Sequence, residues 1–343
     1  MHMADALLSP AVGAAMCAAG AAANAYAVKK IKKDELCEKK IPVMGVMGAF
    51  VFAAQMINFT IPGTGSSGHI GGGILLAAMI GGFPALLSIS AVLVIQCLFF
   101  ADGGLLALGC NIFNIGVVPC LIAYPLIFRP LTKNGRTFGK ITAASVAAAV
   151  AGLQLGAFCV VLQTRISGIA ELPFGTFLLL MQPIHLAIGL AEGAITAAVL
   201  CFVHKMRPEI MESAFEGAGI QSGVPVRNII IALAAAALLA GGVLSLFASP
   251  DPDGLEWAIE KTAGTHGPEA EGAVFEGAAS IQEAVAFMPD YGFKDPGEEG
   301  SNSSSMGTAL AGMVGGAIVF IAAGGAAFGI SAFKKRRKGS ASA

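Results

Sequence analysis

Charged side chains are scarce in this 343-residue sequence. Only 13% of its residues are Asp, Glu, Lys or Arg, whereas a soluble domain of this length carries about 25%. Hydrophobic residues make up 55% of the chain, and its mean hydropathy is +0.75. The shortage of charge argues against a water-soluble globular protein and predicts one that is embedded in lipid.

Several motifs that carry enzymatic or cofactor chemistry are also missing. The seven cysteines show no C-x-x-C spacing, so the sequence predicts neither a thiolate metal site nor a disulfide framework. Without an H-E-x-x-H segment, a membrane metalloprotease is not supported. Without a G-x-x-x-x-G-K-[ST] segment, the chain cannot supply ATP hydrolysis itself. We therefore expect a non-enzymatic protein with no prosthetic group.

The start of the chain lacks the positive charge that opens a cleavable signal peptide. The segment MHMAD (residues 1–5) precedes the first apolar run, and positive charges follow that run. We therefore expect the N-terminus to face outward and to stay attached.

Eight apolar runs are each long enough for a bilayer-spanning helix of about 20 residues. They cover residues 9–28, 42–60, 70–101, 104–128, 139–163, 176–203, 226–248 and 307–333. Run 70–101 is too long for one crossing. It is interrupted at Gly81–Pro84, and we expect its first piece to be short and to lie against protein or reach only part way.

Positive clusters flank these runs at residues 29–40, 129–140, 204–207 and 334–338. All four should be cytoplasmic by the positive-inside rule, and they are too short to suggest nucleic-acid binding. Residue 70 then lies outside and residue 129 inside, so the chain between them must cross the membrane an odd number of times. Splitting run 70–101 at Pro84 gives three crossings and meets this requirement. The topology that results has nine crossings of the inner membrane, with the N-terminus outside and the C-terminus in the cytoplasm.

The predicted fold is all-α, a polytopic membrane bundle of about nine transmembrane helices. Residues 1–210 form a seven-helix bundle, and residues 211–225 form a cytoplasmic linker. Residues 226–343 form a two-helix hairpin around an external loop, 249–306. Twelve acidic residues and only two lysines lie between Asp251 and Glu299. The segment GEEGSNSSS (297–305) is typical of a flexible lead into the last helix.

The same topology brings Met1, His2 and His69 to the outer side. A free α-amine, the next peptide nitrogen once deprotonated and a histidine imidazole form a tridentate chelate, to which His69 would add a fourth nitrogen. A planar set of four nitrogens suits Ni²⁺ or Cu²⁺ and can hold Co²⁺, whereas Zn²⁺ prefers a tetrahedron. His69 lies in GTGSSGHIGGG (63–73), where glycine allows the backbone to approach a ligand. A disordered chain start and a plain flexible loop are the alternatives.

Other polar residues are expected near this outer end. Asn58 and Gln96 lie at the ends of crossings, and Asp102 is followed by two glycines. Each could orient an imidazole or be an ordinary cap or turn. Asn111 and Asn114 share a helix face about one to two turns below Asp102.

His185 and Glu192 lie on one face of run 176–203, near the middle of the membrane. Ionisable groups at this depth are costly and usually face the interior of a bundle. A transport relay and a buried hydrogen-bonded structural pair are both consistent with the sequence. Their depth places them too far from His2 to bind the same ion directly.

Several segments resemble a known family. MHMADALLSP (1–10), SSGHIGGG (66–73), DGGLLALGCNIFNIG (102–116) and HLAIGLAEG (185–193) resemble the CbiM/NikM substrate-binding (S) components of cobalt/nickel energy-coupling-factor (ECF) transporters. DPDGLEWAIEKTAG (251–264) and MPDYGF (288–293) resemble the PDGLE module of the NikN type, which would be fused here as residues 226–343.

The resemblance implies a metal held by the Met1 amine, His2 and a loop histidine, which matches His69. It also implies a membrane coupling (T) subunit and ATPase subunits as partners. Nickel-type members often begin Met-His-Ile-Pro-Asp-Gly, whereas this chain begins MHMADA, so the motif does not decide between nickel and cobalt. The fused module favours nickel slightly.

We therefore expect the substrate-capture subunit of an ATP-driven importer of Ni²⁺ or Co²⁺. The external acidic loop would load or gate the metal, or would be only a spacer. The alternative is a stand-alone secondary metal-ion transporter that uses His185 and Glu192.

Overall fold

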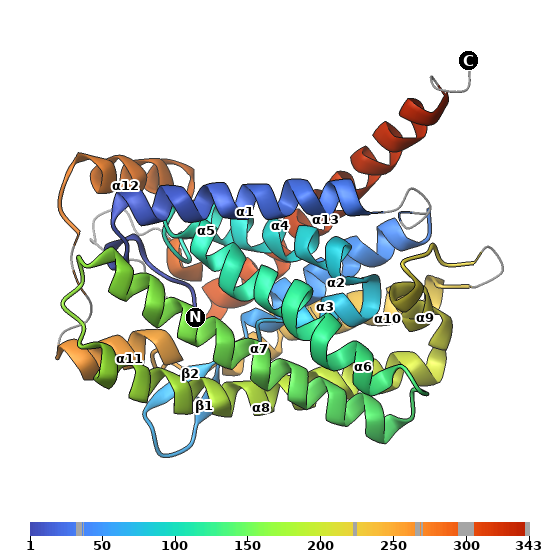
Figure 1. Cartoon of the computed structure of the whole chain (residues 1–343), viewed down its shortest axis with the longest axis horizontal. Helices are drawn as coiled ribbons and strands as arrows, with labels where there is room; N and C mark the ends of the chain where they lie inside the picture. Colours follow the sequence, from blue (N-terminus) through green and yellow to red (C-terminus); the bar gives the residue numbers. More distant parts are fainter. Residues whose placement is uncertain are drawn as a thin grey trace.

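The computed structural model describes residues 1–31, 36, 38–221, 225–264, 268, 270–293 and 305–339, with side chains as far as residue 336. It is a helical bundle (Figure 1), which confirms the predicted all-α class. The predicted flexible lead at 297–305 lies outside the described residues except for Ser305, as do parts of the basic clusters at 29–40 and 334–338.

Seven helical segments within the described ranges are long and apolar enough to cross a membrane. Each coincides with a predicted apolar run. They are α1 (Pro10–Lys30), α4 (Gly82–Phe100), α5 with η2 and α6 (Leu108–Asn111, Ile112–Phe128, Arg129–Thr132), α7 (Phe138–Ser167), α8 (Phe174–Met206), α10 with η3 (Arg227–Gly242, Leu244–Phe247) and α13 (Ser305–Gly339).

The other two predicted crossings correspond to shorter helices. α2 (Lys40–Gln55) has 16 residues. α3 (Gly73–Ile80) has 8, or about 12 Å at 1.5 Å per residue, which is less than half of the hydrocarbon core. Every residue of α3 is buried, so this helix lies against protein, as the sequence predicted. Nine crossings were predicted, and the described part of the chain contains seven helices of membrane length together with the shorter α2 and α3.

The break between α3 and α4 lies at Gly81 rather than at Pro84. Gly81 has a φ of 90°, a conformation that glycine adopts without steric cost. Pro84 lies in the first turn of α4, where its missing N–H removes no helical hydrogen bond.

Glycines allow the closest helix contacts in the N-terminal part of the bundle. α7 and α8 pack along their length, and a Cβ on Gly189 or Gly193 would lie 2.9 Å from the Cα of Val150 or 2.5 Å from the Cα of Val146. η2 is a wide, π-helical segment that contains Pro119 and Pro125. Each proline removes one backbone donor from the helix.

Residues after 226 pack directly on the N-terminal part of the bundle. α10 and α13 both lie against α2. A Cβ on Gly312 would lie 2.7 Å from the Cα of Gly241, and one on Gly45 would lie 2.9 Å from the carbonyl oxygen of Phe320. These backbones therefore approach as closely as in tightly packed transmembrane pairs.

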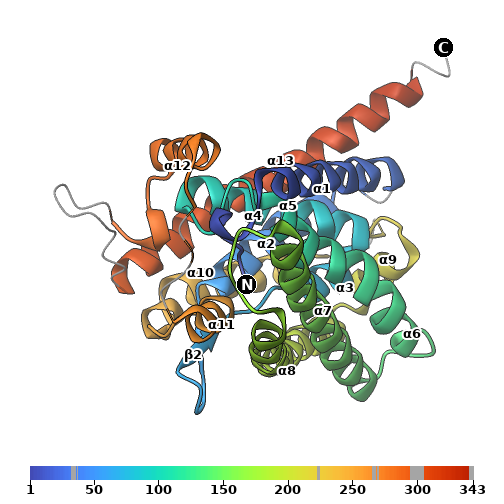
Figure 2. The ribbon, with the colours of Figure 1, turned by 60° about the vertical axis from the view of Figure 1, so that its left-hand side comes forward.

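The small elements gather at the two ends of the bundle (Figure 1). One end carries the antiparallel hairpin of β1 (Phe59–Ile61) and β2 (Ser66–Gly68), with η1 (Asp5–Leu7), α11 (Gly254–Ala263), α12 (Ala273–Val285) and η4 (Pro289–Tyr291). α9 (Pro208–Glu216) and α6 lie toward the other end. Figures 1 and 2 show the chain start among the helices, not at the edge of the molecule.

Candidate metal centre

The first three residues are inserted into the bundle. Met1 is 7% exposed and Met3 is 0% exposed. The Met3 amide donates to Asn111 Oδ1 at 2.8 Å, and Asn111 Nδ2 donates to the Met3 carbonyl at 3.2 Å. The Gly104 amide donates to the same carbonyl at 2.9 Å. Asn111 therefore fixes where Met1 and His2 lie.

The Met1 amine forms an ion pair with Asp253, at 2.6 Å from Oδ2. Asp253 caps α11, because its Oδ1 accepts from the amides of Leu255 (2.7 Å) and Glu256 (2.9 Å). Burial is the largest single influence and raises the pKa of Asp253, but the positive amine, His69 and the hydrogen bonds from the amine and the Glu256 amide together outweigh it, so the net shift is downward. The carboxylate is therefore charged at neutral pH and faces the amine.

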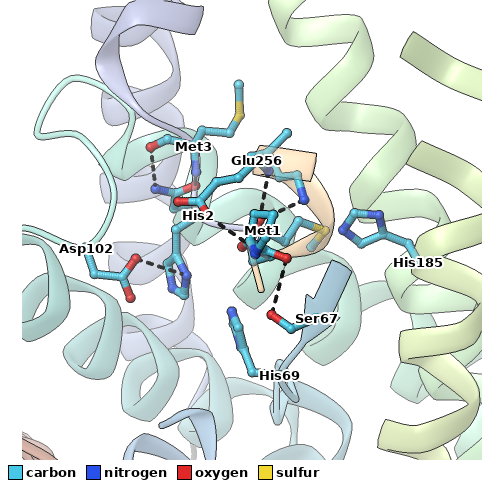
Figure 3. A network of polar contacts seen from close by, with 12 residues as sticks. Met1, His2, Met3, Ser67, His69, Asp102, His185 and Glu256 are labelled. Carbon is cyan, nitrogen blue, oxygen red and sulfur yellow. Dashed lines mark hydrogen bonds and ion pairs between the residues drawn. The ribbon is translucent and has the colours of Figure 1, made fainter. Parts of the chain in front are cut away.

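The rings of His2 and His69 face each other (Figure 3). Their centroids are 5.3 Å apart and their planes differ by 20°. Burial lowers the pKa of His2, with partial opposition from Asp102. Burial, followed by the charges of the amine and His2, lowers the pKa of His69 to about 4. Both imidazoles are therefore neutral at pH 7, the form that binds metals.

A chain of hydrogen bonds sets the tautomer of His2. The Gly71 carbonyl can only accept, so the amide nitrogen of Gln55 faces it at 3.0 Å. Gln55 Oε1 then accepts from Gln96 Nε2 at 2.8 Å. Gln96 Oε1 is left facing His2 Nε2 at 3.2 Å, so Nε2 carries the proton. The lone pair of His2 is on Nδ1, the nitrogen that can close a chelate ring with the His2 amide nitrogen.

His69 is oriented in a similar way. Its Nδ1 lies 3.1 Å from the Ile70 carbonyl, which can only accept, so the free lone pair is on Nε2. Glu192 holds the loop that follows, since its two oxygens accept from the amides of Gly71 (2.7 Å) and Gly72 (3.0 Å). Glu192 thus supports the His69 loop.

Asp102 lies beside the free lone pair of His2. Its Oδ1 is 3.4 Å from His2 Nδ1, and its Oδ2 accepts from the Tyr291 hydroxyl. A carboxylate oxygen and an unprotonated imidazole nitrogen are both acceptors, so they attract each other only through a proton or a cation. This arrangement favours a positive ion close to His2.

The sequence left two alternatives for His185 and Glu192, a transport relay and a hydrogen-bonded pair. The two side chains bind different partners, so they do not form that pair. His185 Nδ1 donates to the Met181 carbonyl at 2.8 Å, and its buried Nε2 has no hydrogen-bond partner among the described residues. His185 lines a small cavity together with Met1, His69 and Asp253. It thus lies next to two candidate ligands, although the sequence placed it too far from His2 to bind the same ion.

A larger cavity of about 410 Å³ lies next to His2 and His69. Asn58 lines it without contacting either histidine in the described part of the chain, and its carbonyl accepts from the Ser249 amide at 2.8 Å. Five carboxylates also line this cavity: Asp102, Asp251, Asp253, Glu256 and Asp290. A concave surface of negative charge raises the local concentration of cations.

The charge of Asp253, and then burial, raises the pKa of Glu256 to about 6. Carboxylates in this cavity are therefore close enough to affect one another's ionisation. A bound cation would relieve the repulsion between them.

The structure brings together the predicted donors Met1, His2 and His69, with Gln96 and Asp102 beside them. Among the described residues, no group of three or more His, Cys, Asp or Glu side chains forms a metal site, because this donor set depends on backbone nitrogens. The two rings are stacked, so their lone pairs do not converge on one point until a ring turns. Gln55 and Asp253 were not predicted from the sequence. Gln55 is a polar residue within apolar run 42–60, and Asp253 lies within the PDGLE motif.

Comparison with known proteins identifies two regions of the chain. Residues 2–210 match the family described as "Cobalt uptake substrate-specific transmembrane region" (CbiM), and residues 227–332 match the PDGLE domain. The chain is 31% identical to the "Putative fused nickel transport protein NikMN" of Archaeoglobus fulgidus, over 93% of this chain and 95% of that protein. It is 29% identical to the "Cobalt transport protein CbiM" of Geobacter sulfurreducens, over 71% and 70% of the two chains.

Solved structures are similar as well. A "Truncated Transition metal Transporter" is 28% identical, with a TM-score of 0.53, over 60% of this chain and 99% of that one. A second structure, titled "transition metal transporter", is also 28% identical with a TM-score of 0.53, over 63% of this chain and 98% of that one. The chain is thus a multi-pass membrane protein that belongs to the CbiM family of cobalt- and nickel-transport substrate components, with a PDGLE domain fused after it.

Proposed function

We propose that this protein is the metal-capture subunit of an ATP-driven ECF importer of Ni²⁺ or Co²⁺. The observation that carries the proposal is the meeting of the Met1 amine, His2 and His69 beside an acidic cavity. The family match supports it, and relatives are named as nickel and cobalt transport proteins. A membrane coupling subunit and ATPase subunits would supply the energy, since this sequence has no phosphate-binding loop.

The ion would be held by four nitrogens. These are the Met1 amine, the His2 amide nitrogen, His2 Nδ1 and His69 Nε2. The hydrogen bonds that place protons on His2 Nε2 and His69 Nδ1 leave these imidazole nitrogens free. Gln96 and the Ile70 carbonyl would act as the outer partners that orient the two rings.

Nickel is the favoured substrate. A deprotonated peptide nitrogen in a planar set suits Ni²⁺ more than Co²⁺ or Zn²⁺. A relative that matches 93% of this chain is named as a putative fused nickel transport protein. Cu²⁺ would bind a planar nitrogen site more tightly still by the Irving–Williams order, so exclusion of copper must depend on its availability.

The cavity would open to the outside of the inner membrane. The last turns of two helices, at the end far from the cavity, carry basic residues: Lys29 and Lys30 in α1, and His204 and Lys205 in α8. Arg129 of α6 lies at the same end and donates to the Phe215 carbonyl of α9. By the positive-inside rule this end is cytoplasmic. The N-terminus is then on the outer side and the C-terminus in the cytoplasm.

Metal binding by the full chain in detergent tests the proposal. Equilibrium dialysis with Ni²⁺ should show binding that is lost in His2→Ala and in His69→Ala and kept in His204→Ala, a control at the opposite end. One residue added before Met1 should also abolish binding, because it moves the amine out of register. Undiminished affinity in the two alanine variants and the extended chain would overturn the proposal.

A stand-alone secondary transporter is the second candidate. It is favoured by His185, whose free Nε2 lines the cavity beside Met1 and His69 and could receive an ion moving inward. Glu192 is a weak relay because both of its oxygens bind backbone amides. Ni²⁺ uptake by vesicles that contain only this chain and no ATP would support this candidate; absence of uptake supports the ATP-driven importer.

A further inference from the structure

The segment 251–257 of the PDGLE domain lies across the metal centre, and we call it the strap. The Ser67 amide donates to the Pro252 carbonyl at 2.8 Å, and Ser67 Oγ donates to the Asp251 carbonyl at 2.8 Å. Trp257 Nε1 donates to the Thr64 carbonyl at 2.9 Å. The strap is therefore joined to the hairpin that precedes His69 (Figure 3).

The other side of the strap fits against α8. A Cβ on Gly254 would lie 3.1 Å from both Ile184 and Ile188 and 3.4 Å from His185. The backbone thus sits as close to α8 as a glycine permits. This contact fixes the position of Asp253, whose Oδ2 lies on the Met1 amine.

A second contact from the same domain reaches His2. The Tyr291 hydroxyl donates to Asp102 Oδ2, while Asp102 Oδ1 lies beside His2 Nδ1. Tyr291 is held in place by stacking on Phe100, with ring centroids 5.1 Å apart. The PDGLE domain therefore contacts one candidate ligand directly, through Asp253, and another through Asp102.

The charges at Asp253 also match a bound dication. In the absence of metal, the ammonium and the carboxylate cancel. A divalent ion brings two positive charges to the site. It displaces one proton from the amine and one from the His2 peptide nitrogen, and both protons pass to water in the cavity, so two positive charges leave. The net charge then stays zero. Without the carboxylate, the metal-bound site keeps an uncompensated buried positive charge, which is costly.

We propose that the PDGLE domain is a structural part of the metal site and retains the captured ion. Asp253 positions the Met1 amine and supplies the counter-charge, and Tyr291 positions His2 by holding Asp102. This inference rests on the proposed function of Met1, His2 and His69 as ligands. It assigns Asp253 and Tyr291 as positioning residues of the site.

The test compares Asp253→Asn with Glu260→Gln in the full chain. Asparagine also caps helices well, so α11 should persist. Glu260 lies on the same helix but lines neither cavity described above, and each variant loses one negative charge from the PDGLE domain. Asp253→Asn should bind Ni²⁺ about 10- to 100-fold more weakly, chiefly through faster release into a chelator, with a shifted visible absorption band of the bound Ni²⁺. Glu260→Gln should stay within about twofold of the unmodified chain.

Tyr291→Phe supplies a second test that removes no helix cap. It should speed Ni²⁺ release about tenfold, whereas Tyr26→Phe, far from the site, should not. Equal affinity, release rate and spectrum in Asp253→Asn and Glu260→Gln, together with an unchanged Tyr291→Phe, would overturn the inference. If His2→Ala and His69→Ala still abolish binding in that case, the proposed function stands; if they also bind normally, it fails too.

Discussion

Asn111 pairs with the backbone of Met3 through both ends of its side-chain amide. The Asn111 side chain thus bonds the backbone of Met3 as a neighbouring β-strand would, with one donor and one acceptor. We predict that Asn111→Asp, which cannot donate to the Met3 carbonyl, weakens Ni²⁺ binding about 10- to 100-fold although no ligand is changed. Isothermal titration of the purified variant checks this. Asn24→Asp, whose side chain bonds only within α1, is the control and should bind normally.

Gln55 is predicted to act on His2 indirectly, through Gln96. Gln55→Leu removes the group that fixes the orientation of Gln96, so Gln96 can turn and the proton on His2 is no longer confined to Nε2. We expect an affinity loss of about tenfold and a broadened visible spectrum of the bound Ni²⁺. Gln154→Leu, in a glutamine pair between α7 and α8, should leave the spectrum unchanged. A normal spectrum in Gln55→Leu would show that this hydrogen-bond chain does not set the tautomer.

Glu192 is predicted to matter for the stability of the His69 loop. In Glu192→Gln one of the Gly71 and Gly72 amides faces an NH₂ group and loses its acceptor, which costs about 1–3 kcal/mol for a buried donor. Thermal unfolding in detergent should show a lower Tm, with weaker Ni²⁺ binding. Glu212→Gln is the control, since its side chain is 51% exposed. Equal melting of the two variants would contradict the prediction.

Gly104 gives the sharpest steric prediction. A Cβ there would lie 1.8 Å from Asp5 Oδ1 and 2.4 Å from the Asp5 amide nitrogen. Gly104→Ala should therefore expel the chain start and abolish Ni²⁺ binding while the rest of the bundle stays folded. Gly139→Ala, where nothing lies within 4 Å, should bind normally. Limited proteolysis at the N-terminus would detect the expelled segment.

His69 should make the folded chain sensitive to mild acid. Its pKa is lowered by burial to about 4, whereas an unfolded histidine titrates near 6.5. Between these values the unfolded state binds the extra proton, so the contribution of His69 to stability falls as the pH drops from about 6.5 to about 4. Without metal, the Tm of the unmodified chain should fall more between pH 7 and pH 5 than the Tm of the His69→Gln variant. Parallel plots of Tm against pH for the unmodified chain and for His69→Gln would refute this prediction.

The sequence predicted the helical class and the three candidate donors, because both follow from local features. Apolar runs of membrane length predict helices, and a histidine after a free amine is a chelate wherever it lies. The length of α2 did not follow, because apolar composition does not show where a helix ends. The short α3 did follow from the break in run 70–101, and it lies against protein as expected.

Asp253 could not be placed from the sequence. Its contact with Met1 depends on the fit of Gly254 against α8, which is a tertiary property. The same holds for Gln55, whose role appears only once Gln96 and the Gly71 carbonyl lie on either side of it. The parity of crossings assigns segments to a side of the membrane, but it does not show which side chains meet there.

The ion pair of Met1 with Asp253 joins positions that are 252 residues apart. Closing so long a loop is slow compared with forming neighbouring helix pairs. Met1 is made early and must therefore wait until α10 has been inserted before its partner Asp253 arrives. The candidate metal centre is consequently one of the last parts of the molecule to mature, and a chain whose synthesis stops before the strap would reach the membrane without the partner of Met1.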